Sequence, residues 1–419
     1  MHSSSPALRA LFVTTAAALG VLVTAAGTLA HPGPGRASRA GEGDGPASPD
    51  ASSVPYASGE DGYDTYRIPA VVRTAEGALL AFAEGRVGGA GDTGDIDIVV
   101  RRSTDGGRTW GPLTVVARGE GDTRGNPAPV VDPATGRVVL VTCFNGGGAT
   151  EAAIMRGEVA PEDSRRVFVQ TSDDDGRTFG EPREITDAVK PAHWRWYATG
   201  PGHAIALTRG EHAGRLVVPS NHSAAPPDGS PDTGQEAKYY GAHALVSDDG
   251  GDTWRVGYVD DSYEGELNAN ESLAAELPDG RLYFNARDQN GSAAGNRLDT
   301  YSADGGETLE RPYRVQASLN DVPVVQGSVL QLAGGRHAPL LFAGPSDPGA
   351  RRALAVWRSD DAGASFRRVA TLSESPAAYS DLVPLDAGGE GDASAVGVLW
   401  ETGEDRPYER IEFRRLTDF

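Results

Sequence analysis

The chain has 419 residues, of which 39% are hydrophobic, so it is long enough to bury a large core. Its formal net charge of −21 argues against nucleic-acid binding as the main role, and an anionic ligand would need a local group of basic side chains. A single cysteine, Cys143, excludes an internal disulfide, and we interpret it as a buried small apolar residue in a strand.

The N-terminal segment has the pattern of a secretion signal. One basic residue, Arg9, precedes an uncharged apolar run over 10–30, and small residues stand at Thr28 and Ala30. We therefore predict a signal peptide over residues 1–30, cleaved after Ala30, and a secreted, extracellular protein without stable membrane association. The alternative is an uncleaved anchor, because an apolar run of this length could span a bilayer.

The next segment, residues 31–54, is rich in Pro, Gly, Ser and Ala and has no aromatic residue, which predicts a disordered linker. From residue 55 onward, short apolar runs alternate with turn residues, and no later linker divides the chain. We therefore expect one monomeric domain over 55–419.

One short motif is repeated along this domain: Ser-x-Asp-x-Gly-x-[Thr/Ser] followed by an aromatic or apolar residue. Its five copies begin at Ser103, Ser172, Ser247, Ser302 and Ser359. Repeats at this spacing are typical of propellers and solenoids. The Ser and Asp side chains can bond turn amides and the glycine permits positive φ, so we interpret the motif aspartates as structural.

Five such turns, with strands before the first and after the last, predict an all-β fold. We expect a six-bladed β-propeller of four-stranded antiparallel sheets. Residues 411–416 alternate like a strand and are expected to close the ring beside the strand over 66–72. The sequence contains no amphipathic run long enough to predict a major helix.

The repeated turn resembles the Asp box of the sialidases, and three arginine motifs resemble the secreted bacterial exo-α-sialidases (neuraminidases). They are Tyr-Arg-Ile-Pro around Arg67, Asn-Ala-Arg-Asp around Arg287, and the run that begins at Arg351. The resemblance implies that these arginines converge on the propeller axis and bind the carboxylate of sialic acid. Guanidinium groups suit this role because they bind carboxylates bidentately and stay charged. The neighbouring Arg352 is the alternative for the third position.

The resemblance also implies a tyrosine nucleophile. Tyr379 lies in a Tyr-Ser-Asp-Leu segment, and Glu271, in Asn-Glu-Ser-Leu, matches the glutamate that acts as its base. The anomeric carbon of sialic acid carries a carboxylate, so a neutral phenol avoids the charge repulsion that a carboxylate nucleophile would meet. A phenol with a pKa of about 10 needs such a base.

A glycine-rich loop over 84–97 contains three aspartates. By its position in the resemblance, Asp92 is the acid/base residue that protonates the leaving oxygen and then activates water. Asp95 is the rival candidate, and Asp97, at the start of a strand, is interpreted as structural.

Two further residues are candidates for the site. Glu401, in Trp-Glu-Thr-Gly, matches a glutamate that orients Arg67, and Asn126, in Gly-Asn-Pro-Ala-Pro, is a candidate for contact with the sugar. A Trp-rich segment over 194–203 also resembles the family, and its aromatic residues either line the pocket or pack in the core. The histidines are not spaced as in known metal-binding motifs, so no metal and no cofactor are expected.

Together these motifs imply a retaining exo-α-sialidase that removes terminal α-linked sialic acids from glycoproteins, glycolipids and oligosaccharides through a tyrosyl-enzyme intermediate. One alternative is a trans-sialidase or an intramolecular, anhydro-forming sialidase. Another is a catalytically weak sialic-acid-binding lectin, which the presence of both Tyr379 and Glu271 disfavours. A third is a plain interaction propeller, which would have no reason to carry the three arginines.

Overall fold

The computed structural model describes residues 52–260, 267–291, 295–386 and 395–417. The predicted signal peptide and the predicted linker up to residue 51 lie outside these residues. None of the helices in the described part of the chain is long and apolar enough to cross a membrane.

The described strands form six four-stranded antiparallel units, which we number as blades 1 to 6 along the chain. Blade 1 contains β2 (Thr65–Arg73), β3 (Leu79–Arg86), β4 (Ile96–Ser103) and β5 (Thr114–Ala117), and blade 2 contains β6 (Thr123–Val131), β7 (Val138–Asn145), β8 (Arg166–Ser172) and β9 (Arg183–Glu184). Blade 3 contains β10 (Trp194–Thr199), β12 (Leu216–Ala224), β13 (Tyr240–Ser247) and β14 (Arg255–Asp260), with β11 (Ile205–Ala206) beside β12. A parallel bridge between Ile96 and Thr123 joins blades 1 and 2 into one continuous hydrogen-bonded sheet.

Blades 4 to 6 complete the ring. Blade 4 contains β15 (Ala269–Glu276), β16 (Leu282–Asp288), β17 (Arg297–Ser302) and β18 (Arg314–Val315), and blade 5 contains β19 (Ser328–Gln331), β20 (Leu340–Asp347), β21 (Ala350–Ser359) and β22 (Arg367–Thr371). Blade 6 contains β23 (Ala377–Pro384), β24 (Val396–Thr402), β25 (Arg410–Leu416) and β1 (Ser53–Ala57). The inner strands of successive blades pack against one another around the centre. The predicted all-β propeller of antiparallel sheets is confirmed.

Helices are short in the described residues, as the lack of an amphipathic run indicated. The two α-helices are α1 (Glu151–Arg156) and α2 (Thr186–Val189), and the three 3₁₀ turns span Pro161–Asp163, Ala237–Tyr239 and Ala317–Leu319. Of these, α1 contributes to the central cavity, because Glu151 at its first position lines it.

The repeated motif folds each turn by the same hydrogen bonds. In the first copy the Gly107 amide donates to Ser103 Oγ (2.8 Å), while the Thr109 amide and hydroxyl donate to the two oxygens of Asp105 (3.0 and 2.6 Å). The same three contacts recur in the other four copies. The motif aspartates therefore build turns, as predicted, and are not part of the site.

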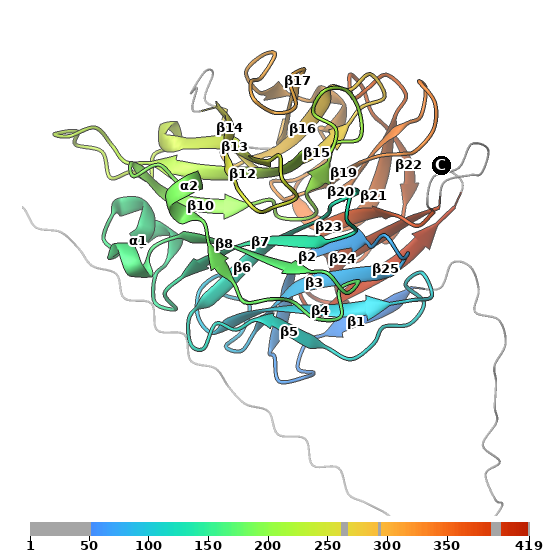
Figure 1. The fold of residues 1–419 in the computed structure, drawn as a ribbon, viewed down its shortest axis with the longest axis horizontal. Coiled ribbons are helices and arrows are strands. Elements are labelled where there is room, and N and C mark those ends of the chain that lie inside the picture. Colours follow the sequence, from blue (N-terminus) through green and yellow to red (C-terminus); the bar gives the residue numbers. More distant parts are fainter. Residues whose placement is uncertain (1–51, 261–266, 292–294, 387–394, 418–419) are drawn as a thin grey trace, which may run out of the picture. The chain divides into compact units, whose positions relative to one another are not determined.

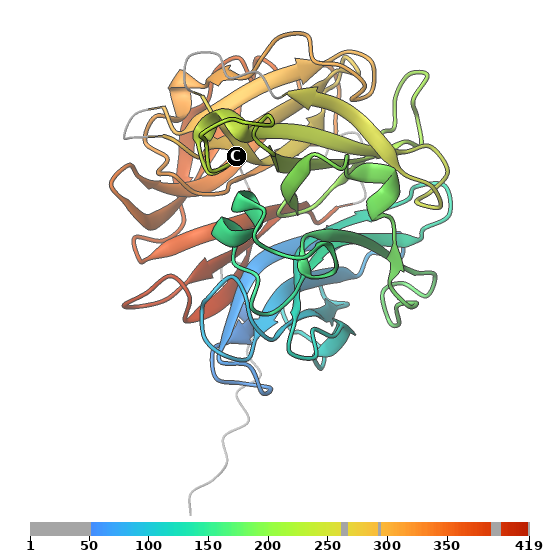
Figure 2. The ribbon, with the colours of Figure 1, turned by 90° about the vertical axis from the view of Figure 1, so that its left-hand side faces the viewer.

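The closure of the ring differs from the prediction. Residues 411–416 lie in β25, which pairs with β24 and with β1, not with the strand over 66–72. That strand is β2, whose backbone pairs with β3 as the inner strand of blade 1. In Figures 1 and 2 the blue N-terminal and red C-terminal strands lie side by side, and β1 begins at Ser53, within the residues expected to form the linker.

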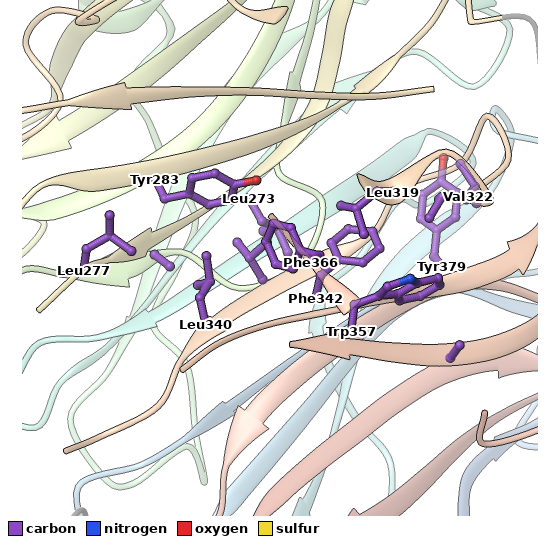
Figure 3. Close-up of a cluster of buried hydrophobic side chains, with 14 of the residues drawn as sticks. Leu273, Leu277, Tyr283, Leu319, Val322, Leu340, Phe342, Trp357, Phe366 and Tyr379 are labelled. Atoms are coloured by element: carbon purple, nitrogen blue, oxygen red, sulfur yellow. The ribbon is translucent and has the colours of Figure 1, made fainter. Parts of the chain in front are cut away.

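A hydrophobic cluster between blades 4, 5 and 6 borders the cavity at Tyr379. Leu273, Phe342 and Trp357 belong to one buried cluster, and Tyr379 from β23 is part of it. Figure 3 shows Tyr379 at one end of this cluster, beside Val322. The ring of Tyr379 is thus held by core packing while its hydroxyl reaches the cavity.

Candidate active site

A cavity of about 280 Å³ lies where the inner strands meet. It is lined by all seven residues that the sequence analysis assigned to catalysis or substrate binding: Arg67, Asp92, Asn126, Glu271, Arg287, Arg351 and Tyr379. The eighth candidate, Glu401, is fully buried behind Arg67. Residues more than 300 positions apart in the sequence therefore meet at one site.

Five of the inner strands carry an irregularity at the cavity. The pairing register shifts in β2, β6, β10, β15 and β23 within the segments 67–70, 125–128, 194–197, 269–272 and 377–380. Each segment contains a side chain that lines the cavity. A bulge interrupts the alternation of a strand and redirects its side chains, so the bulges aim these residues at a common point. At two of them, Ile68 and Asn126, the backbone is left-handed, with φ of 58° and 56°.

Glu401 connects the first arginine to the nucleophile candidate. Its carboxylate accepts hydrogen bonds from Arg67 Nε (2.9 Å), from the Ile68 amide (2.8 Å) and from the Tyr379 amide (3.1 Å). Burial works against the charge on Arg67, but the Glu401 carboxylate together with the phenols of Tyr379 and Tyr408 outweighs it and raises the pKa of Arg67. The ion pair expected between these two residues is present, and the same carboxylate fixes the bulges of β2 and β23.

Tyr379 and Glu271 are directly hydrogen-bonded, with the phenol donating to Glu271 Oε1. Arg287 Nη1 donates to the other carboxylate oxygen (2.9 Å) and lies 3.4 Å from the phenol oxygen. Burial first, and then the Glu271 carboxylate, raise the pKa of Tyr379, against the opposing effect of three arginines. The phenol is therefore neutral at rest and is bonded to a group that can accept its proton.

Arg351 completes a group of three arginines around Tyr379. It donates to the Tyr408 hydroxyl (3.0 Å) and to the Val324 carbonyl (3.3 Å). The guanidinium carbons of Arg67 and Arg351 lie 5.2 and 5.8 Å from the centre of the Tyr379 ring. The alternative residue, Arg352, is exposed and bonds the Glu374 carbonyl instead.

Asp92 lies at the rim of the cavity, with 76% of its side chain exposed. Its Oδ1 accepts a hydrogen bond from Arg86 Nη1 (2.8 Å) and lies 3.6 Å from Arg67 Nη1. Burial of part of the carboxyl would raise its pKa, but Arg86 and Arg67 together lower the pKa of Asp92. The rival Asp95 accepts from the Gly121 amide, and Asp97 is buried against Tyr63.

The sequence analysis did not identify Arg86 or Glu84, although both lie in the loop segment that it considered. Arg86 holds Asp92 and also donates to the carbonyls of Ala90 and Gly91, so it fixes the loop. Glu84 pairs with Arg86 and accepts from the Asn126 amide (2.8 Å), which links blades 1 and 2. A Glu-Gly-Arg sequence directly before the aspartate loop is the signal that could have indicated them.

The cavity lining includes further residues that the sequence analysis did not assign, among them Trp196, Glu151 and Arg165. Trp196 lines the cavity while Trp194 packs in the core, which separates the two roles considered for the Trp-rich segment. Glu151 on α1 and Arg165 just before β8 also line it, and no local sequence pattern distinguishes either residue. Among the described residues, no group of three or more His, Cys, Asp or Glu side chains could hold a metal ion.

Comparison with known proteins identifies the family. The family model described as BNR repeat-like domain matches residues 77–390. The exo-alpha-sialidase of Aspergillus fumigatus is 32% identical over 335 residues, which cover 76% of this chain and 72% of that protein. The chain belongs to the sialidase family. It is therefore a glycoside hydrolase.

Other sialidases agree in sequence and fold. The sialidase of Micromonospora viridifaciens is 29% identical over 368 residues, 85% of this chain but only 53% of that protein, so this chain spans about half its length. The solved structure of the Hadza microbial sialidase Hz136 superposes with a TM-score of 0.73 at 26% identity, covering 87% of this chain and 68% of that one. Both resemblances cover most of this chain, including most of the propeller that surrounds the cavity.

Proposed function

We propose that this protein is a retaining exo-α-sialidase that hydrolyses terminal α-linked sialic acids of glycoproteins, glycolipids and oligosaccharides through a tyrosyl-enzyme intermediate. The observation that carries the proposal is the hydrogen bond between Tyr379 and Glu271 inside a group of three arginines. Arg67, Arg287 and Arg351 bind the substrate carboxylate, which places the adjacent anomeric carbon near the phenol oxygen.

The first chemical step forms the glycosyl-enzyme. Asp92, in its protonated form, donates its proton to the glycosidic oxygen as the bond between that oxygen and the anomeric carbon breaks. The Tyr379 oxygen bonds to the same carbon, and its proton passes to Glu271, to which it is already hydrogen-bonded. The position of Asp92 at the exposed rim supports this role, because the leaving alcohol departs toward solvent.

The second step releases the sugar. The Asp92 carboxylate takes a proton from water, the water oxygen bonds to the anomeric carbon, and the bond to Tyr379 breaks while Glu271 returns the proton to the phenol. Two displacements at one carbon retain its configuration, so the α-anomer of sialic acid is the first product. A lectin would need the arginines but not the bonded Tyr379–Glu271 pair, which favours hydrolysis.

The test is release of 4-methylumbelliferone from its α-N-acetylneuraminide by the purified protein. We expect turnover that falls by at least about 100-fold in kcat/KM in Arg67→Ala and Arg351→Ala, because each loses a charged bidentate contact. Arg352→Ala is a matched control, since the neighbouring side chain is exposed outside the cavity, and it should stay within about twofold. Absence of turnover by the folded protein, or proton NMR that shows the β-anomer first, contradicts the proposal.

We also propose that the protein is exported and processed at its N-terminus. The support is the sequence of residues 1–30, with one basic residue before an apolar run that ends in small residues. Mass spectrometry of protein from the culture medium should give a chain that begins at His31. An intact N-terminus in the membrane fraction would support the anchor instead.

A further inference from the structure

Tyr408 contacts two of the three arginines that are proposed to bind the substrate carboxylate. The guanidinium carbon of Arg67 lies 4.1 Å from the centre of its ring, and Arg351 Nη1 donates a hydrogen bond to its hydroxyl (3.0 Å). Tyr408 itself is not part of the cavity lining. Any effect of Tyr408 on a bound ligand therefore passes through these two arginines.

The hairpin between β24 and β25 holds Arg67 on two sides. Glu401 of β24 accepts hydrogen bonds from Nε (2.9 Å) and Nη2 (3.4 Å) along one edge of the guanidinium plane, and Tyr408 in the turn covers one face. The negative face of an aromatic ring attracts a cation, so this contact is favourable. With an edge and a face occupied, Nη1 of Arg67 stays beside Asp92, which lines the cavity.

Arg351 differs from the other two arginines in the charge of its partners. Arg67 and Arg287 are each bonded to a glutamate. Among the described residues, the side chain of Arg351 is hydrogen-bonded to the Tyr408 hydroxyl and to the Val324 carbonyl (3.3 Å), and both acceptors are uncharged. A neutral acceptor fixes the direction of a guanidinium without cancelling its charge. The positive charge of Arg351 therefore remains available to an anionic ligand.

The turn that carries Tyr408 is itself held in place. The Glu409 carboxylate accepts hydrogen bonds from three successive backbone amides over 404–406, at 2.8, 3.2 and 2.9 Å. Ser58, which follows β1, donates its hydroxyl to the Tyr408 carbonyl (2.8 Å). The backbone of Tyr408 is thus fixed by its own turn and by the N-terminal strand of blade 6, so its side chain can fix other groups.

We infer that Tyr408 is a positioning residue that sets Arg67 and Arg351 at the spacing and orientation required to bind the substrate carboxylate. Two guanidinium groups at one site repel each other, and Tyr408 offers its ring face to one and its hydroxyl oxygen to the other. The carboxylate then meets donors that are already aligned. This inference rests on the proposed function, because it uses the carboxylate-binding role of the arginines.

The first measurement is steady-state kinetics on 4-methylumbelliferyl α-N-acetylneuraminide. Tyr408→Phe keeps the ring and removes the hydroxyl, and KM should rise about tenfold while kcat stays within about twofold, because the carboxylate is bound in the ground state and in the transition state alike. Tyr408→Leu also loses the ring over Arg67 and should raise KM by at least about 30-fold. Tyr301→Phe is the matched control, because its hydroxyl bonds the Ala362 carbonyl (3.0 Å) outside the cavity lining, and its KM should stay within about twofold.

A double-mutant cycle separates positioning from a general effect on the fold. The probe is 2-deoxy-2,3-didehydro-N-acetylneuraminic acid, whose Kd is measured by calorimetry. Tyr408→Phe should raise this Kd about tenfold in the natural protein but less than about twofold in an Arg351→Met background, where the hydroxyl has no guanidinium to hold. An unchanged KM and Kd in Tyr408→Phe, a loss confined to kcat, or an equal effect in both backgrounds overturns the inference.

The same titration distinguishes this inference from the proposed function. If the natural protein binds the probe without cleaving the substrate, and Tyr408→Phe binds it about tenfold more weakly, hydrolysis is rejected and the inference stands. Turnover with an unchanged KM in Tyr408→Phe rejects the inference alone, and a folded protein that neither cleaves the substrate nor binds the probe rejects both.

A second variant decides if Tyr408→Phe does not fold. Glu409→Ala removes the acceptor of the three turn amides and leaves Tyr408 and the arginines in place. Its KM should rise by at least about threefold, because the turn that presents Tyr408 is released. An unchanged KM in Glu409→Ala would then overturn the inference.

Discussion

The ring of Tyr379 is buried in the core, whereas its hydroxyl faces the cavity. Replacing it by phenylalanine keeps the ring in the cluster between blades 4, 5 and 6 and removes only the oxygen that bonds Glu271. We expect Tyr379→Phe to lower kcat by at least about 1000-fold because the proposed nucleophile is lost, with little change in melting temperature. Steady-state kinetics and a thermal melt check this, and a fully active variant would overturn the assignment of the nucleophile.

The charge of Arg86 controls the proposed acid. Asp92 must be protonated to act on the glycosidic oxygen, and Arg86 and Arg67 lower its pKa, so activity is lost as pH rises through that pKa. Removing one of these charges in Arg86→Met raises the pKa of Asp92, and the alkaline limb of kcat/KM should move to higher pH. The total rate should also fall, since Arg86 holds the loop.

The pH profile of kcat/KM measures this shift directly. Arg177→Met, at an exposed turn far from the cavity lining, serves as a control and should leave the profile in place. A limb that stays fixed in Arg86→Met, or moves to lower pH, would show that Asp92 is not the group that titrates.

At the scale of the strand, one carboxylate connects three elements near the centre. Asp381 on β23 accepts hydrogen bonds from the Val71 amide of β2 (2.8 Å), from the amide and ring of His203 (3.0 and 2.7 Å), and from Ser328 of β19 (2.9 Å). Asp381→Asn replaces an acceptor oxygen by a donor that faces other donors. The free energy of unfolding should fall by about 3 kcal/mol.

Urea denaturation measures this loss, with the exposed Asp405→Asn as a control that should change stability by less than about 0.5 kcal/mol. If both variants lose a similar free energy of unfolding, the hydrogen bonds of Asp381 make no special contribution to stability.

Blade 3 contains a buried histidine pair that makes stability depend on pH. Nδ1 of His222 lies 3.1 Å from Nδ1 of His243, and Trp194 stacks on His222 at 3.7 Å. Burial, with a smaller effect of His193, lowers the pKa of His222 to about 3, and burial lowers that of His243 well below its ordinary value. The unfolded chain takes up these protons near pH 6.5, so the free energy of unfolding falls as pH falls below that value.

The expected slope is at most about 1.4 kcal/mol per pH unit for each histidine. Unfolding in urea between pH 6.5 and 4.5 should show a smaller slope in His243→Gln and an unchanged slope in His337→Gln, whose side chain is exposed. Equal slopes in all three proteins would mean that other groups control acid sensitivity.

At the scale of the whole molecule, the ring is closed by strands from both ends of the described chain. Tyr56 of β1 is buried, donates its hydroxyl to the Ala81 carbonyl of blade 1 (2.7 Å), and packs 4.8 Å from the ring of Tyr66. Tyr56→Ala should therefore lower the free energy of unfolding by about 3–5 kcal/mol. On the same strand Val54 is 47% exposed, so Val54→Ala is the matched control, and denaturation curves that shift equally would exclude a special role for closure.

The sequence by itself determined the architecture and most of the proposed site. The repeated turns are encoded by short-range hydrogen bonds, so five copies between Ser103 and Ser359 were enough to predict a propeller. The site candidates were found because each arginine, Tyr379 and Glu271 stands in a short motif that is visible in the linear order, and the structure brings them into one cavity.

Only the tertiary structure decided which side chains complete the cavity and how they are charged. Bulges in the inner strands break the alternation on which strand patterns depend, so the sequence could not decide whether Trp194 or Trp196 faces the cavity. Arg165 and Glu151 line the cavity although no local sequence pattern distinguishes them. The pairing of β25 with β1 joins residues more than 300 positions apart, which strand patterns do not predict. Burial raises the pKa of Tyr379, whereas Arg86 and Arg67 lower that of Asp92 against the effect of burial, and these surroundings exist only in the folded protein.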